Sequence, residues 1–149
     1  MNKTILLVED NPDDEALTLR AVRKHVSYGI VVVRDGAEAL EYLFGTGRYA
    51  GRDLLVNPLL ILLDLKLPKV NGLEVLRRMR DDARTRSIPV IVFTSSTEEQ
   101  DILDSYRLGA NSYIRKPVDY GQFCDNMKQV MNYWLCVNQL PPQRNCAVA

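Results

Sequence analysis

The stretch LLILLDLKLPKVNG, residues 59–72, decides the fold. Five apolar residues run without interruption, the run ends at Asp64, and Pro68 follows shortly afterwards. An unbroken apolar run of this length is typical of a strand that is covered on both faces, as in a parallel sheet. A buried charge without a partner is costly, so the carboxylate at the end of such a strand needs an explanation. By itself, Asp64 could cap the next turn.

Apolar runs of strand length recur along the chain, and helical patterns separate them. The strands are predicted at residues 4–8, 29–33, 59–63, 89–93 and 112–115. Regular alternation of strand and helix predicts an α/β fold with one five-stranded parallel sheet, doubly wound as (βα)5, with right-handed crossovers. No internal repeat, low-complexity tract or second domain interrupts the pattern.

The predicted helices carry recognisable end signals. Asn11 or Asp13 can cap the first helix, and Gly45 is suited to end the second. Residues 97–100 have the pattern of a capping box for the fourth helix. The pairs Asp13-Asp14 and Asp81-Asp82 are expected to be solvated helix ends. The last helix has one apolar face, made of Phe123, Met127, Val130, Met131 and Trp134.

Length and composition limit the possible classes of protein. The 149 residues fit one domain, and we expect a folded domain over residues 1–140 and a disordered tail over 141–149. With 19 basic and 19 acidic residues, the chain has no general charge for binding nucleic acid or an anionic membrane. Three cysteines without motif spacing predict a reducing compartment, and there is neither a signal-like run nor a span-length apolar segment. A cytoplasmic protein is expected.

Polar residues follow four of the five predicted strands. They are Glu9-Asp10, Asp64, Thr94 and Lys116, the last directly before Pro117. Ligands of parallel sheets bind just beyond the carboxyl ends of the strands, so these groups should meet. Crowded carboxylates repel one another unless a cation neutralises them, and hard oxygen ligands favour Mg²⁺ or Mn²⁺ over zinc. A carboxylate beside a metal, a lysine and a hydroxyl suits phosphoryl transfer onto aspartate.

Four segments together resemble the receiver domain of two-component response regulators. They are ILLVEDNPDD (5–14), LILLDLKLPKVNGLEVL (60–76), IPVIVFTSS (88–96) and GANSYIRKPVD (109–119), and the resemblance covers about residues 3–135. It implies the flavodoxin-like receiver fold. It also implies that Asp64 is the phosphoacceptor and that Lys116, before a cis peptide to Pro117, pairs with the phosphoryl group.

The resemblance implies further roles. Asp10, Glu9 and Asp64 would hold the metal together with the backbone carbonyl of Lys66. Thr94 and Tyr113 would be the switch residues, whose hydroxyl and ring turn inward after phosphorylation. For Tyr113, a packed, half-buried strand residue is the alternative reading.

Within this family, the chain resembles single-domain regulators of cyanobacterial phytochromes. The features are the long connection at 45–58, the stretch RLGANSYIRKPVDYGQF (107–123) and NYWL (132–135) in the last helix. This implies a module that accepts phosphate on Asp64 from a sensor histidine kinase, a phytochrome, and acts through an unknown downstream protein. The alternatives are a receiver in another bacterial phosphorelay, a Mg²⁺-dependent aspartyl-phosphate hydrolase and a degenerate scaffold.

Two further expectations concern regulation. Related phosphatases place an acid two residues after the nucleophile, where this chain has Lys66. Ser96, two residues after Thr94, is also poorly suited to position water. We therefore expect a phosphoryl group that survives minutes or longer, in a signalling module that catalyses only its own phosphorylation and slow dephosphorylation. Apolar residues beyond the core stripe of the last helix, Tyr133, Val137 and Leu140, suggest a homodimer.

Overall fold

The computed structural model describes residues 3–143, and strands and helices alternate along all of it. The elements are β1 (Thr4–Val8), α1 (Pro12–Arg23), β2 (Gly29–Val33), α2 (Gly36–Phe44), the 3₁₀-helix η1 (Gly47–Tyr49), β3 (Leu60–Leu63), α3 (Gly72–Asp81), β4 (Val90–Thr94), α4 (Glu99–Arg107), β5 (Ser112–Arg115), α5 (Tyr120–Asn132) and the π-helical turn η2 (Tyr133–Val137). The predicted strands are confirmed to within one residue.

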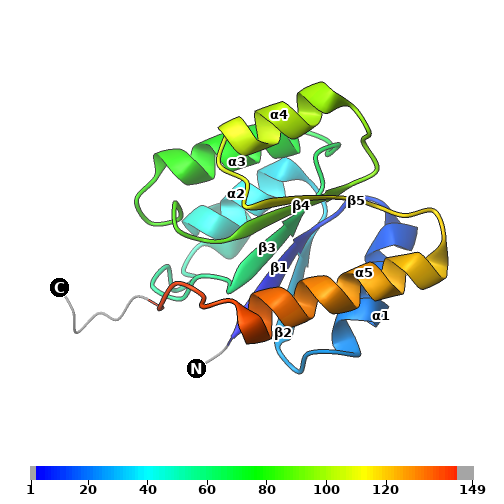
Figure 1. Cartoon of the computed structure of the whole chain (residues 1–149). Coiled ribbons are helices and arrows are strands. Elements are labelled where there is room, and N and C mark those ends of the chain that lie inside the picture. The colour runs from blue at the N-terminus through cyan, green and yellow to red at the C-terminus, as the bar shows by residue number, and fades with distance from the viewer. Residues whose placement is uncertain (1–2, 144–149) are drawn as a thin grey trace.

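The five strands form one parallel sheet in the order β2-β1-β3-β4-β5 (Figure 1). In register, Val8 pairs with Val33 of β2 and with Leu63 of β3, so the neighbouring strands end at the same level. The doubly wound α/β fold is therefore confirmed. The residues that follow each strand reach one common edge of the sheet.

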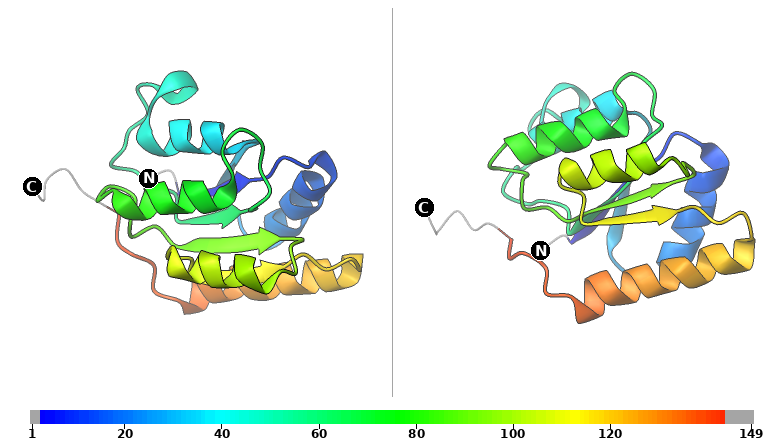
Figure 2. Two further views of the ribbon diagram at one scale, coloured as in Figure 1. Left: turned by 90° about the horizontal axis from the view of Figure 1, so that it is seen from above. Right: turned by 45° about the horizontal axis from the view of Figure 1, so that its top comes forward.

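The continuous apolar runs are explained by two cores, one on each face of the sheet. Alternate residues of a strand point to opposite faces. Leu6 and Val8 of β1 pack with residues of α2 and α3, whereas Ile5 and Leu7 pack with residues of α1 and α5. Figures 1 and 2 show α3 and α4 on one side of the sheet and α5 on the other. The predicted apolar face of the last helix is confirmed, with Phe123, Met127 and Met131 buried and Val130 and Trp134 packed against that core.

Two of the helix ends follow the sequence signals, and one does not. Asn11 caps α1 by accepting from the backbone N–H groups of Asp13 and Asp14, and Gly45 ends α2 with a left-handed φ of 67°. The capping box predicted at Thr97 is wrong, because α4 begins at Glu99. Instead the hydroxyl of Ser96 accepts from the backbone N–H of Glu98 at 3.3 Å and so takes over part of the capping role.

The segment after η2 passes the edge of the sheet at which the strands begin (Figure 1). There the side chain of Gln143 forms two hydrogen bonds with the backbone of Asn57, at 3.1 and 3.0 Å. Gln143, the third residue of the predicted tail 141–149, is therefore attached to the domain. The remainder of that tail, 144–149, lies outside the described residues.

Within residues 3–143, no helix is both long and apolar enough to cross a bilayer.

Candidate functional site

The loop after β3 places Asp64 at the carboxyl edge of the sheet. It turns back on itself so that the backbone N–H of Gly72, the first residue of α3, donates to the carbonyl oxygen of Leu65 at 2.9 Å. A Cβ atom at Gly72 would lie 2.4 Å from the carbonyl oxygen of Asp64. Because real Cβ atoms do not come so close, glycine allows α3 to begin directly against the residue that follows β3.

Asp64 is 7% exposed and its carboxylate is held by groups from three directions. Oδ1 accepts from the hydroxyl of Thr94 at 2.8 Å and from the backbone N–H of Lys66 at 3.2 Å. Oδ2 accepts from the ammonium group of Lys116 at 2.9 Å. The ends of β4 and β5 thus both reach the carboxylate that follows β3, which is the convergence that the sequence predicted.

Lys116 connects the acidic groups of the site. Its Nζ donates to Glu9 at 2.5 Å, to Asp14 at 2.9 Å and to Asp64, so each of its three protons has a carboxylate partner. Burial by itself would lower the pKa of Lys116. The hydrogen bond to Glu9 and the charge of Asp64 outweigh burial, so the pKa rises and the side chain remains an ammonium cation.

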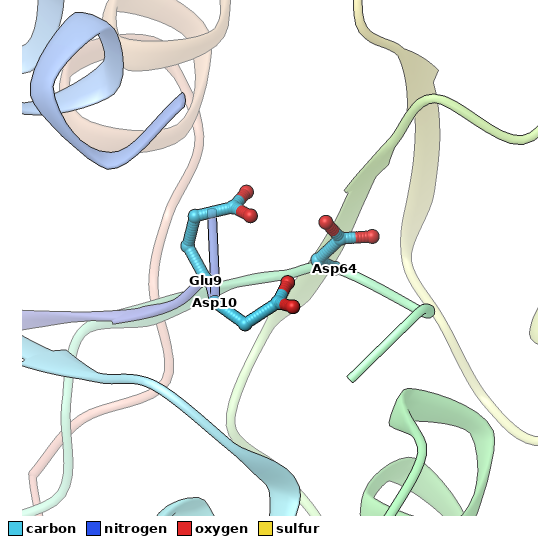
Figure 3. A group of neighbouring side chains, drawn as sticks. All are labelled: Glu9, Asp10 and Asp64. Atoms are coloured by element: carbon cyan, nitrogen blue, oxygen red, sulfur yellow. The ribbon is translucent and has the colours of Figure 1, made fainter. Parts of the chain in front are cut away.

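Glu9, Asp10 and Asp64 form a group that could hold a cation. One carboxylate oxygen of each lies within 4.8 Å of the others, and Figure 3 shows the three side chains meeting beyond the ends of β1 and β3. Burial raises the pKa of Glu9 to about 7, although the hydrogen bond and charge of Lys116 oppose this rise. Carboxylate oxygens are the ligands that Mg²⁺ and Mn²⁺ prefer, so these residues fit such an ion.

Ser96 forms hydrogen bonds with Thr94, Tyr113 and Asp101. Its backbone N–H points at the Thr94 hydroxyl oxygen at 3.5 Å, and its carbonyl accepts from the hydroxyl of Tyr113 at 3.1 Å. Its own hydroxyl donates to Asp101 of α4 at 2.5 Å. Tyr113 is half-buried and packs against the core beside α2 and α3. The two predicted switch residues are therefore both connected to the segment that leads into α4.

The structure brings most of the predicted site residues together. Five of them meet at one edge of the sheet: Glu9, Asp10, Asp64, Thr94 and Lys116. Tyr113 is linked to Thr94 through Ser96, whose carbonyl accepts from the Tyr113 hydroxyl. The predicted cis peptide before Pro117 is wrong, because residues 3–143 contain no cis peptide bond.

Asp14 is a site residue that the sequence reading missed. It was expected to be a solvated helix end, but its carboxylate binds Lys116 across the sheet edge. A signal for this was present, since Asp14 precedes the buried residues Thr18 and Ala21 by four and seven positions and so lies on the same face of α1.

Comparison with known proteins identifies the family. The family model for the response regulator receiver domain matches residues 5–128. The probable methanogenesis regulatory protein FilR2 of Methanothrix harundinacea is 41% identical over 92% of this chain and 86% of its own length. The response regulator Rcp1 of Synechocystis is 34% identical over 93% of each chain.

Solved structures agree with this assignment. The phosphorylated cyanobacterial phytochrome response regulator RcpA superimposes with a TM-score of 0.88 at 40% identity, covering 95% of this chain and all of the other. The bacteriophytochrome response regulator RtBRR is 50% identical with a TM-score of 0.76, covering 95% of this chain and 86% of the other. A Mn²⁺-bound form of Rcp1 has a TM-score of 0.87 and covers 94% and 99% of the two chains.

Proposed function

The chain belongs to the response regulator receiver family, and on that premise we propose that Asp64 accepts a phosphoryl group from a sensor histidine kinase. A receiver of this kind is a signalling module and not a classical enzyme. One observation carries the proposal. The Asp64 carboxylate is hydrogen-bonded to the Thr94 hydroxyl and the Lys116 ammonium, and it lies beside the carboxylates of Glu9 and Asp10.

The residues of the site support a direct displacement at phosphorus. An Asp64 oxygen attacks the phosphorus atom, the bond from phosphorus to the donor nitrogen breaks, and Asp64 becomes an acyl phosphate. Glu9, Asp10, Asp64 and the backbone carbonyl of Lys66 would hold Mg²⁺ or Mn²⁺, which neutralises charge on the phosphoryl oxygens when bound. Lys116 then offers a positive charge, and Thr94 a hydroxyl, to the new group.

Access to Asp64 is from the side of Asp10. This residue is exposed, whereas Glu9 is 1% exposed and Thr94 is fully buried. A surface pocket beside Asp10 is bounded by the β3–α3 loop, including Lys66, and by Asp101 of α4. Leu65, the residue after Asp64, also lines this pocket, which supports an approach of the donor histidine from this side.

We propose that the phosphorylated state is relayed through Ser96. When the Thr94 hydroxyl follows the phosphoryl group, the backbone of Ser96 moves with it. That movement changes both the position of Tyr113 and the start of α4. The output surface is then formed by α4, β5 and α5. The group is expected to persist for minutes or longer, which is supported by the exposed Lys66 side chain and by the Ser96 hydroxyl, already bonded to Asp101.

The proposed donor is a phytochrome kinase. Support comes from the likeness to RcpA, Rcp1 and RtBRR, two of which are described as phytochrome or bacteriophytochrome response regulators. FilR2 is described as a methanogenesis regulator, so a receiver in another phosphorelay is the competing input. A homodimer through the last two elements, α5 and η2, is supported by the exposure of Tyr133 and Val137 in η2.

Two experiments test this function. Pure protein is incubated with Mg²⁺ and acetyl phosphate and then weighed by mass spectrometry. We expect a gain of one phosphoryl group that is lost in Asp64→Asn. Phosphorylated kinases, including a phytochrome, are then mixed with both proteins, and selective transfer to the wild type identifies the input. No gain, or an equal gain in Asp64→Asn, would contradict the assignment of Asp64.

A further inference from the structure

Asp14 contacts the functional lysine from outside the strand-end motifs. It lies in the first turn of α1, and its Oδ2 accepts from Lys116 Nζ at 2.9 Å. The two residues are 102 positions apart, so the contact joins the start of α1 to the end of β5. The Asp14 side chain is 31% exposed, whereas that of Lys116 is 6% exposed. The lysine is therefore buried beneath a carboxylate at the rim of the site.

The three partners of Lys116 differ in what else they can bind. Glu9 and Asp64 are two of the three residues, with Asp10, whose carboxylates could hold a cation. Asp14 is not one of these three residues. A divalent cation in that group competes with Lys116 for the oxygens of Glu9 and Asp64, because both attract the same negative charge. When a cation binds Glu9 and Asp64, Asp14 is the carboxylate that remains hydrogen-bonded to Lys116.

We propose that Asp14 is a positioning residue that holds Lys116 against the reacting site once a cation and a phosphoryl group occupy Glu9 and Asp64. The inference rests on the proposed function, since it assumes that Lys116 meets the phosphoryl group. Asp14 does not touch the reacting atoms and acts through Lys116. An ammonium group has no fixed direction of its own, so its position depends on the carboxylates around it.

The helix carries a matched control. Asp13 lies in the same first turn, is exposed, and has the same favourable interaction with the helix N-terminus. Asp13→Asn and Asp14→Asn therefore change the net charge and the helix dipole interaction equally. They differ in the contact with Lys116. Asp14→Glu keeps the carboxylate and serves as the conservative rescue.

The direct test measures how firmly the Lys116 ammonium group is held and does not depend on phosphorylation activity. The protein is labelled with ¹⁵N-lysine, saturated with Mg²⁺, and hydrogen exchange of the Lys116 side-chain ammonium is followed by NMR. Asp14→Asn should accelerate exchange about tenfold, because one charge-assisted hydrogen bond is lost. Asp13→Asn should match the wild type, and Asp14→Glu should restore slow exchange. Equal exchange in Asp14→Asn and the wild type overturns the proposal.

A second measurement separates the inference from the proposed function. Phosphorylation by acetyl phosphate should be about tenfold slower in Asp14→Asn than in the wild type, as for other small misplacements of a reacting group, and unchanged in Asp13→Asn. An unchanged or faster rate in Asp14→Asn overturns the positioning role. If the wild type takes up no phosphoryl group, the proposed function fails, and the exchange experiment still decides whether Asp14 holds Lys116.

Discussion

Replacing Lys116 with methionine should cost the protein much of its stability near neutral pH when no metal is present. Lys116 pairs with Glu9 and Asp64, whose side chains are 2% and 8% exposed, and these two pairs dominate the loss. The pair with Asp14 contributes less, since that carboxylate is partly solvated. Removing one partner of a buried ion pair costs about 3–5 kcal/mol, because the remaining charge stays unpaired.

We take the lower end of that range, about 3 kcal/mol, since Glu9 can escape by binding a proton. Burial already raises the pKa of Glu9 from 4.5 to about 7, with Lys116 in place to oppose the rise. A carboxyl group whose pKa is raised by folding destabilises the fold increasingly as pH rises from the unfolded value through the folded value. The loss in Lys116→Met should therefore be larger at about pH 8 than at about pH 5.

Urea unfolding measures both effects. With an m-value of about 1.5 kcal/mol per molar, a loss of about 3 kcal/mol lowers the urea midpoint by about 2 M. Saturating Mg²⁺ should bring the variant closer to the stability of the metal-free wild type, because a ligand at a hundred times its Kd adds about 2.7 kcal/mol. Lys128→Met, which removes an exposed lysine of α5, is the control and should unfold like the wild type. An unchanged midpoint at the higher pH, or a larger loss at the lower pH, would refute this reasoning.

Three other changes have defined outcomes. Gly72→Ala should destabilise the protein by about 1–3 kcal/mol in thermal unfolding, because the new Cβ meets the backbone of Asp64. Gly29→Ala is the control and should change the stability little, because its Cβ would be 3.5 Å from its nearest neighbour. Loss of phosphate from Asp64, followed with ³²P, should take minutes or longer in the wild type, and rapid loss would count against a long-lived signal. The loss should be faster in Lys66→Glu, which adds an acid near the acyl phosphate. Mg²⁺ affinity measured by calorimetry should fall as pH drops below about 7, because buried Glu9 then binds a proton that the cation must displace. Glu9→Gln should make the affinity less dependent on pH, and an equally steep fall in this variant would assign the proton to another group.

The strands and the strand-end residues could be predicted because their signals are local. An unbroken run such as Leu60–Leu63 is long enough to identify a buried strand. Parallel topology then brings Glu9, Asp64, Thr94 and Lys116 to one edge, whatever the details of packing.

Features that depend on contacts distant in sequence were harder to predict. Asp14 appeared to be a solvated helix end. Its spacing from Thr18 and Ala21 places it on the buried face of α1, but nothing near it in sequence identifies Lys116 as its partner. The capping box at Thr97 failed for a related reason. The Ser96 carbonyl bonds to Tyr113, 17 residues away, and the Ser96 hydroxyl bonds to Asp101 and to the backbone N–H of Glu98, so α4 begins after Glu98 and Thr97 does not cap it.

The contacts of Ser96 imply a sharp response. One residue touches Thr94 through its amide, Tyr113 through its carbonyl and Asp101 through its hydroxyl. Since the two peptide groups that flank one Cα atom and a short side chain carry all three links, they cannot rearrange one at a time without straining the others. The two conformations of the proposed switch should therefore interchange as a unit, with few intermediates, so that a graded input changes the fraction of responding molecules and not the shape of each one.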